Sequence, residues 1–469
     1  MMKLKSINIP VYVCFILSVL IVVFLFPMEA KFPYIEGNDL WTTLWQLGLI
    51  FGIFLLVGGL IACFFFYFYY LRKNIFLKKK DLFFSFLMMM IFIVLTEIGI
   101  SYKLFGVYMI PYAIIPIVVR NFFDSRTAQM THLITVLICS LMIPSPWEFV
   151  MMQVFVCMVT IYVLRDLTQR WQLIVCSFYI LLTYILVYSG ILLLQNGDFS
   201  EWDWNMLIYF GINFLLVMCA YPFINILERI FGYISNVTLI ELSDINLPIL
   251  RQLSEKAPGT FQHSLQVSML GTAAAVKVGA NPQLIRTGAL YHDIGKIENP
   301  LYFVENRLAG PDPHEELGLV ESARIITRHV PDGVKIAEKH SIPKTIIQFI
   351  KTHHGTGKAK YFYNSFINQF PGEPVDESAF TYLGENPDTK ETAILMMADS
   401  VEAASRSLTD YSENSLRNLI DKIINNQIAD GLLENAPLTF KNIKEIKQVF
   451  LERLLSVYHL RITYPEVKN

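Results

Sequence analysis

The first half of the chain is a succession of long apolar runs that short polar loops separate. Most of these runs approach the roughly 20 residues that a helix needs to cross a bilayer. They span residues 9–27, 44–71, 82–101, 105–119, 129–143, 149–164, 173–194 and 206–226. The pattern predicts eight membrane-spanning helices, of which the two at 105–119 and 129–143 are the shortest.

The loops between these runs predict which side of the membrane each one faces. Lysine and arginine gather in every second loop, at 72–80, 120–126 and 165–170. Because cytoplasmic loops carry the excess of positive charge, both termini are expected in the cytoplasm. Residues 28–32 make a poor cleavage site, so the interpretation is a retained signal anchor (1–28), a short extracellular loop (29–43) and a seven-helix membrane domain (44–228).

After about residue 228 the chain becomes more polar, and apolar positions recur with helical spacing. Residues 229–256 are predicted to be a helical connector, although a plain spacer fits the same pattern. Residues 257–469 show no sustained alternation of the kind that strands require, and they are numerous enough to bury a core. The predicted fold class is all-α, with a polytopic helical membrane domain followed by a cytoplasmic all-helical domain.

The composition supports a membrane protein. The 469 residues are 54% hydrophobic and only 17% charged, which is too apolar for an ordinary soluble protein. All six cysteines fall in apolar runs, and this favours helix packing over a disulfide framework or a zinc site. His132, the one histidine within a predicted span, is likewise interpreted as a residue packed between helices.

One dipeptide in the second half is typical of a metal site. His292 and Asp293 stand side by side in an apolar segment, where burial would penalise either group without a partner. Five further candidate ligands lie elsewhere in this half of the chain: His263, His329, His353, His354 and Asp399.

The ends and buried faces of several helices are predicted to bring these ligands together, as helical bundles do when they bind metals. His263 is expected in the first turn of a helix that Thr260 caps. His329 is expected to end a helix over 321–328, and the paired histidines to end a helix over 344–352. Asp399 lies within an apolar helix over 393–404, where an unpaired carboxylate would be costly.

Seven nitrogen and oxygen ligands are too many for one tetrahedral zinc, so the sequence favours two metal ions. Asp293 would bridge them, with His263, His292 and Asp399 on one ion and the other three histidines on the second. Such a donor set suits iron or manganese better than magnesium. Lys296, one helical turn past His292, is placed to meet a phosphate oxygen, and a solvated lysine is the alternative. Asp293 and Lys296 are thus the candidate catalytic residues.

These motifs resemble the HD-domain metal phosphohydrolases. His263, the His292–Asp293 pair and Asp399 match the motif that defines the family, and the other three histidines match its dinuclear subset. The segments 244–260, 303–306 and 398–407 are similar to the seven-transmembrane HD family of PgpH type. The resemblance implies a bacterial inner or plasma membrane enzyme that hydrolyses cyclic di-AMP to linear pApA with two iron or manganese ions.

The sequence departs from that family at one place. Family members carry a sizeable extracellular domain between the first two spans, where this chain has only residues 28–43. We expect either a naturally short form or an engineered one. The departure puts extracellular sensing in doubt and leaves the metal chemistry untouched.

The sequence indicates the identity of the nucleotide less directly than it indicates the metal ligands. Phosphodiesterases that cleave cyclic di-GMP carry Gly-Tyr-Pro shortly after their paired histidines, whereas here Gly355, Thr356 and Gly357 follow. Aromatic residues near the motifs could stack on adenine, at roughly 1–3 kcal/mol per base, although such residues are as often part of a core. The candidate substrate-binding residues are Lys296, Tyr302, Phe303, Asn306, Thr356, Tyr361 and Arg406.

Other classes of protein fit the sequence less well. A receptor that binds a nucleotide without hydrolysing it would be expected to have lost ligands, and a transporter would carry more charge in its spans than Glu97. A phosphohydrolase acting on another nucleotide stays open. The expected partners are cyclic di-AMP, the lipid bilayer and a second copy of the chain in a homodimer, with no polymeric nucleic acid.

Overall fold

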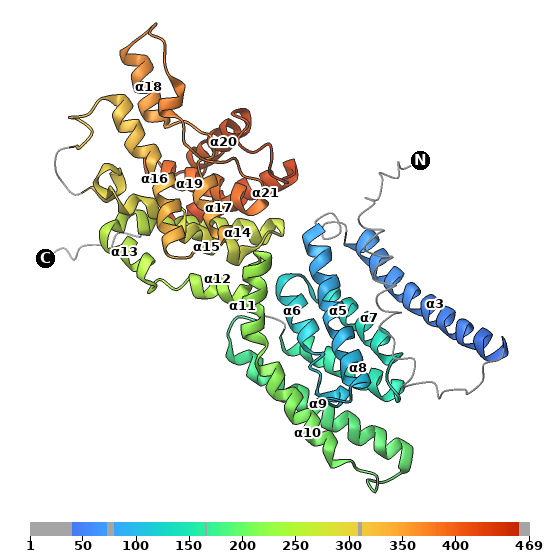
Figure 1. Cartoon of the computed structure of the whole chain (residues 1–469). Coiled ribbons are helices and arrows are strands. Elements are labelled where there is room, and N and C mark those ends of the chain that lie inside the picture. The colour runs from blue at the N-terminus through green and yellow to red at the C-terminus, as the bar shows by residue number, and fades with distance from the viewer. Residues whose placement is uncertain (1–39, 73–78, 165–166, 308–311, 459–469) are drawn as a thin grey trace, which may run out of the picture. The chain divides into compact units, whose positions relative to one another are not determined.

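The computed structural model describes residues 40–72, 79–164, 167–307 and 312–458, and regular structure in these ranges is helical, with one isolated bridge between Lys358 and Thr381. The all-α prediction is confirmed. The chain divides into two compact units after Ser235 (Figure 1). The predicted signal anchor and nearly all of the loop at 29–43 lie outside the described residues.

The first unit is made of helices joined by short loops. Its elements are α3 (Leu40–Leu71), α5 (Lys79–Ser101), η1 (Val107–Met109), α6 (Ile114–Phe122), α7 (Ser125–Ser140), α8 (Pro146–Val163), α9 (Trp171–Asn196), α10 (Trp204–Met218) and α11 (Ala220–Phe231).

Four helices of this unit, α3, α5, α8 and α9, are long and apolar enough to cross a membrane. A fifth crossing arises if α10 and α11, which bend by 43° at Cys219, form one span. These five correspond to predicted spans. The predicted spans at 105–119 and 129–143 are a short broken helix and the 16-residue α7, so the count of eight and the orientation of the termini stay predictions.

The shortness of α7 has a physical reason, because the helix is enclosed by its neighbours. It packs against α3, α5, α6 and α8. Its polar residues Thr131, His132 and Thr135 are all buried. The Nε2 atom of His132 lies 3.1 Å from the backbone oxygen of Gln153 on α8, which confirms the prediction that this histidine is packed between helices.

The second unit contains the predicted metal ligands. Its elements are α12 (Asn236–Leu242), α13 (Pro248–Lys256), α14 (Pro258–Val278), α15 (Pro282–Tyr291), η2 (Ile294–Ile297), η3 (Pro300–Tyr302), η4 (Val304–Asn306), α16 (Leu319–Lys339), α17 (Lys344–Thr352), α18 (Lys360–Gln369), η5 (Glu377–Phe380), α19 (Lys390–Ser405), α20 (Glu413–Ala429) and α21 (Phe440–Tyr458). Its main hydrophobic core joins α14, α15 and α17 to α19, α20 and α21.

The helices at 236–256 belong with this unit. The backbone oxygen of Leu239 on α12 accepts a hydrogen bond from Thr287 on α15, and that of Leu242 accepts one from Tyr291. The helix α13 packs along α14. Most of the segment that the sequence suggested as a connector is therefore part of the second unit's packing.

The prediction that a helix ends at His329 is wrong, because α16 continues to Lys339 with Pro331 inside it. Proline inside a helix removes one hydrogen bond and is costly. Tertiary packing outweighs that cost here. Val330 is buried, and Gly333 lies against Ile350 of α17 and Gly295 of η2.

Candidate metal centre

The seven predicted ligands lie together in the second unit, although they come from α14, α16, α19 and the ends of α15 and α17. Two carboxylates stand at the centre. Asp293 lies 3.3 to 3.8 Å from the Nε2 atoms of four histidines: His263, His292, His329 and His353. Asp399 lies 2.8 Å from His263, 3.6 Å from His292 and 3.7 Å from His354.

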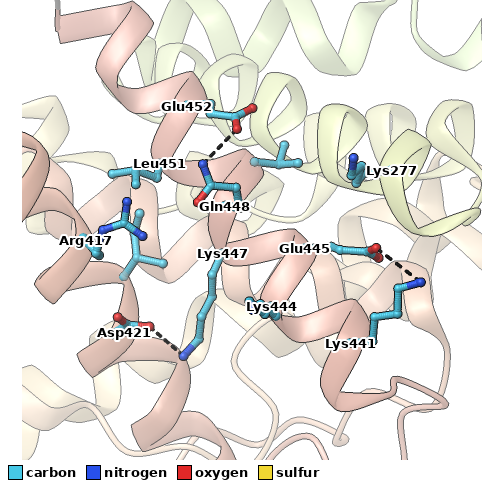
Figure 2. A pocket seen from close by; sticks show the side chains of 12 residues that line it. Lys277, Arg417, Asp421, Lys441, Lys444, Glu445, Lys447, Gln448, Leu451 and Glu452 are labelled. Atoms are coloured by element: carbon cyan, nitrogen blue, oxygen red, sulfur yellow. Dashed lines mark hydrogen bonds and ion pairs between the residues drawn. The ribbon is translucent and has the colours of Figure 1, made fainter.

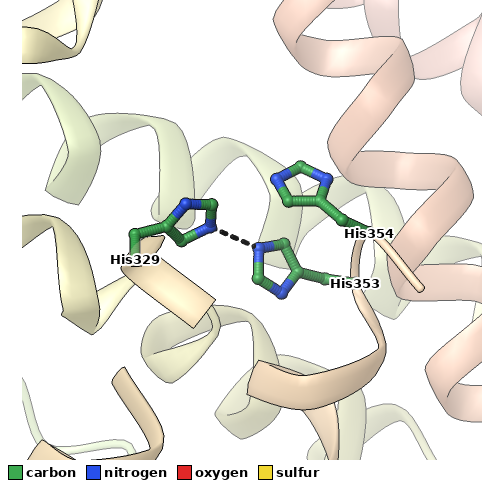
Figure 3. A group of neighbouring side chains, drawn as sticks. All are labelled: His329, His353 and His354. Atoms are coloured by element: carbon green, nitrogen blue, oxygen red, sulfur yellow. Dashed lines mark hydrogen bonds between the residues drawn. The ribbon is translucent and has the colours of Figure 1, made fainter. Parts of the chain in front are cut away.

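Six of the seven predicted ligands, all except Asp399, form two groups that are each compact enough to hold a metal ion. One group is His263, His292 and Asp293, and the other is His329, His353 and His354. The second group is shown in Figure 3, where the Nε2 atoms of His329 and His353 face each other at 3.0 Å. Asp293 reaches both groups, with Oδ2 toward His292 and Oδ1 toward His329.

Three of the rings are held by the backbone of the same helical turn. The Nδ1 atoms of His292, His329 and His353 lie 2.7 to 2.8 Å from backbone oxygens three residues earlier in the chain. Since a carbonyl only accepts, Nδ1 carries a proton, and in the neutral ring Nε2 keeps its lone pair. This is the tautomer that binds a metal, and the outer hydrogen bond is the usual means of orienting such a ligand.

The site passes a test of fit to a metal. The Nε2 atom of His292 and the Oδ1 atom of Asp293 are both buried without a hydrogen-bond partner. Buried polar groups are normally paired, because an unpaired one costs about 1–3 kcal/mol. Two unpaired lone-pair atoms among converging imidazoles and carboxylates are the donor set that a transition-metal ion satisfies.

The electrostatics of the site also favour cations. Burial would raise the pKa of Asp293, but Lys296 and His292 hold it well below its usual range. Burial would lower the pKa of His292, but Asp293 and Asp399 raise it to about 10. Burial dominates at His329 and lowers its pKa to about 3. The carboxylates are therefore ionised and stabilise positive charge beside them.

Lys296 is buried against two carboxylates. Its Nζ atom lies 2.8 Å from Oδ2 of Asp293 and 2.8 Å from Oε1 of Glu305, and 4.8 Å from the centre of the Phe303 ring. Burial would lower the pKa of this lysine, but the two carboxylates raise it above its usual value. A solvated lysine is therefore excluded, and Lys296 holds the candidate bridging carboxylate in place.

The start of α14 differs from the prediction. Thr260 is not the N-cap, because the helix begins at Pro258, and His263 falls in its second turn. The side chain of Asn306 accepts the hydrogen bond from the Thr260 amide and donates one to its hydroxyl. A residue 46 positions away thus caps this helix and ties η4, which also carries Glu305, to the helix of His263.

Gly295 allows α16 to approach the candidate metal centre closely. A Cβ atom at residue 295 would lie 1.9 Å from the backbone oxygen of His329 and 2.6 Å from the amide nitrogen of Gly333. We expect Gly295→Ala to destabilise the second unit by about 3 kcal/mol, since backbone would have to move. For a unit of this size that is roughly 6 to 12 °C in the midpoint of thermal unfolding.

Gly318→Ala is the matched control, because a Cβ atom there meets nothing within 4 Å. Since Gly318 is the N-cap of α16, where alanine is slightly less favourable, we expect the unfolding midpoint to stay within about 4 °C of the wild type. Equal midpoints for the two variants would contradict the close approach at Gly295.

Two residues near the site were missed by the sequence reasoning. Glu402, one turn after Asp399 on α19, pairs through a carboxylate oxygen with Nδ1 of His263. Tyr382 stacks on the His354 ring, with the ring centres 4.1 Å apart. The spacing of Glu402 was a usable signal, because residues three apart share a helix face. Nothing local marks Tyr382.

The candidate substrate-binding residues differ in their contacts and in their exposure. Phe303 is buried against the His329 ring, and Asn306 is engaged in capping α14. Arg406 pairs with Glu402, four residues earlier on α19. The remaining three have other contacts: Tyr302 packs on His314, Thr356 bonds to Asn386, and Tyr361 is 75% exposed beside Phe362.

A hollow of about 700 Å³ lies away from the candidate metal centre, between α14, α20 and α21. It shares none of the seven predicted ligands. Figure 2 shows lysines along its wall, where Lys447 pairs with Asp421 and Lys441 with Glu445. The size of a cavity alone therefore does not identify the candidate active site of this unit.

Comparison with known families defines the class of each unit. The description "7TM receptor with intracellular HD hydrolase" applies to a family whose model matches residues 47–235. The HD domain model matches residues 260–404, which include all seven predicted ligands. The first part of the chain is thus similar to the membrane domain of that family, and the second part contains an HD domain.

Particular relatives share both parts. The cyclic-di-AMP phosphodiesterase PgpH of Listeria monocytogenes is 36% identical over 312 residues, which are 66% of this chain and 43% of that protein. The protein of the same name from Bacillus subtilis is 36% identical over 287 residues, which are 60% of this chain and 40% of that protein. The chain thus spans about two fifths of the length of these relatives.

A solved structure is also similar. The crystal structure of the L. monocytogenes PgpH HD domain in complex with cyclic-di-AMP is 41% identical to this chain in sequence. It covers 45% of this chain and 99% of its own, with a TM-score of 0.44.

Proposed function

We propose that this chain is a membrane-bound, metal-dependent phosphodiesterase that hydrolyses cyclic di-AMP to linear pApA at a dinuclear centre. One observation carries the proposal: six metal-binding side chains form two compact groups, five of them buried, Asp293 reaches both groups, and Asp399 lies beside His263, His292 and His354. Cyclic di-AMP is proposed as the substrate because the PgpH relatives are cyclic-di-AMP phosphodiesterases. Iron or manganese is proposed from the imidazole-rich donor set.

The chain's own residues hold and orient the reacting groups. His263, His292 and Asp399 would hold one ion, and His329, His353 and His354 the other, with Asp293 between them. When bound, the two ions would stabilise the negative charge that develops on the phosphoryl group as water displaces one ester oxygen. Glu402 orients the His263 ring through Nδ1.

Lys296 has capacity left for a phosphate. An ammonium group carries three hydrogens, and two of them serve Asp293 and Glu305. The third is available to a non-bridging phosphate oxygen. We therefore assign Lys296 two roles: it positions Asp293, and it neutralises negative charge on the phosphate of the substrate.

The test is hydrolysis by the full-length chain in lipid nanodiscs, loaded with manganese or, without oxygen, with ferrous iron. Cyclic di-AMP, cyclic di-GMP, the mixed cyclic dinucleotide and pApA are offered separately, and products are separated by chromatography. We expect cyclic di-AMP to give pApA as the main reaction, EDTA to stop it, and metal analysis to find close to two ions per chain.

Each alternative has its own signature in this assay. Tight binding of cyclic di-AMP without turnover would favour the receptor function, and preferential hydrolysis of another nucleotide would favour a different phosphohydrolase. A stoichiometry near one zinc per chain in an active preparation would overturn the dinuclear iron or manganese assignment.

A further inference from the structure

Tyr382 is fixed beside the paired histidines by backbone contacts of its own segment. Residues 357–359, which come shortly after those histidines, are joined to 380–382 by two backbone hydrogen bonds of 2.8 and 2.9 Å. Two residues after Tyr382, a Cβ atom on Gly384 would lie 2.5 Å from the backbone oxygen of Lys351 near the end of α17. The segment that carries Tyr382 is therefore packed closely onto the segment that carries the histidines.

The side chain of Tyr382 presents a free hydroxyl group near the candidate metal centre. Its ring stacks on His354, with the ring centres 4.1 Å apart, and meets the His329 ring edge-on at 5.9 Å. Within the described part of the chain, no group forms a hydrogen bond with this hydroxyl. Its oxygen is not one of the buried unpaired atoms, so solvent reaches it. Tyr382 also lines a cavity of about 260 Å³ that shares His353 and His354 with the centre.

Electrostatic effects on Tyr382 place its phenol group near the charged residues of the centre. Burial raises the pKa of this phenol. Four charged groups also act on that pKa, and all of them belong to the centre or contact it: Lys296, Asp399, Asp293 and Glu305. The lysine lowers the pKa, and the three carboxylates raise it. Because the interaction between charges weakens with distance, the hydroxyl group lies close to where a substrate phosphate would bind.

A hydrogen-bond donor in this position suits the chemistry of a phosphodiester. The two non-bridging oxygens share one negative charge, and further charge develops on the phosphoryl group as water attacks it. The hydroxyl group has one hydrogen to donate, and the stacked ring holds it in place before the reaction begins. Donors that are fixed in advance where charge develops stabilise the transition state more than the ground state.

We propose that Tyr382 is a further catalytic residue, whose hydroxyl group donates a hydrogen bond to a non-bridging oxygen of the phosphodiester at the candidate metal centre. The inference rests on the proposed function and adds a neutral donor to the positive charge of Lys296. The contact is made to the phosphate and not to a base. Its loss should therefore lower the rate of hydrolysis more than the affinity for the substrate.

The test is Tyr382→Phe, which keeps the ring on His354 and removes only the hydroxyl group. The full-length chain in nanodiscs is loaded with manganese, and kcat, KM and metal content are measured with cyclic di-AMP. We expect kcat to fall by roughly 10- to 100-fold, because one hydrogen bond to a charged group is lost from the transition state. KM should stay within about threefold of the wild type. Metal content should equal that of the wild type, because no metal ligand is changed.

Tyr411→Phe is the matched control. The ring of Tyr411 stacks on Tyr458 with the ring centres 4.1 Å apart, as Tyr382 does on His354, but both of these rings pack against the main hydrophobic core. The control removes a hydroxyl group from a stacked tyrosine without touching a predicted metal ligand. It should keep the wild-type kcat, KM and metal content.

Three results for Tyr382→Phe would overturn the inference. An unchanged kcat would show that the hydroxyl group takes no part in the reaction. A rise in KM alone would show a contact made equally in the ground state and the transition state. A loss of metal content together with activity would show that Tyr382 acts only by holding His354.

Failure of the proposed function would look different. The wild-type chain would then be inactive toward every cyclic dinucleotide, and both conclusions would fall together. An active wild type with an equally active Tyr382→Phe variant would overturn the role of Tyr382 alone.

Discussion

Replacing Asp293 by alanine is expected to abolish both metal binding and hydrolysis. Its side chain is 1% exposed and lies within 3.8 Å of four histidines, two from each group of ligands. Its loss would also leave Lys296 with one carboxylate partner instead of two. We expect release of pApA to fall by roughly a thousandfold or more, and metal content to fall well below two ions per chain.

Asp388→Ala is the control for this change, because Asp388 is exposed in the loop before α19. It should keep the wild-type rate and metal content. An Asp293→Ala protein that released pApA at the wild-type rate would show that the bridging assignment is wrong. Circular dichroism of both variants separates loss of the site from loss of the fold.

Glu402→Gln is expected to weaken metal binding by about tenfold, and Glu402→Ala by up to about a hundredfold. The carboxylate accepts a hydrogen bond from Nδ1–H of His263 and so raises the basicity of the Nε2 atom that faces Asp399. The glutamine can still accept this hydrogen bond but carries no charge. Competition with a fluorescent chelator measures the change in affinity directly.

A second glutamate on the next helix provides a matched control. Glu413 on α20 pairs with Arg417 four residues later, as Glu402 pairs with Arg406. Glu413→Gln therefore removes the same kind of ion pair without touching a histidine. If both glutamine variants bound manganese as the wild type does, Glu402 would have no part in tuning His263.

The convergence of the seven candidate ligands could be predicted from the sequence because a buried charge constrains which residues may occur beside it. His292 and Asp293 in an apolar segment already require a partner. The positions of the partners around them could not be predicted in the same way. Glu402 meets His263 across 139 residues, and Tyr382 meets His354 only because of how the chain packs.

Helix boundaries were predicted less well than helix existence. Local chemistry suggested that one helix ends at His329 and that Thr260 caps the start of another. In both cases a distant contact decided the outcome: Gly295 and Ile350 pack against the continued α16, and Asn306 caps α14. The first unit gives a similar example. The helix α7 has only 16 residues and packs against four neighbouring helices, and its own sequence does not show those contacts.

The hydrogen bonds from three histidine rings to backbone oxygens three residues earlier have a consequence for how the protein obtains its metal. Each ring is oriented by its own stretch of chain, so the lone pairs point inward once the helices have formed. We therefore expect metal loading to require no refolding of the chain. With the iron or manganese proposed above, the ion that occupies the centre would then follow the relative supply of the two metals.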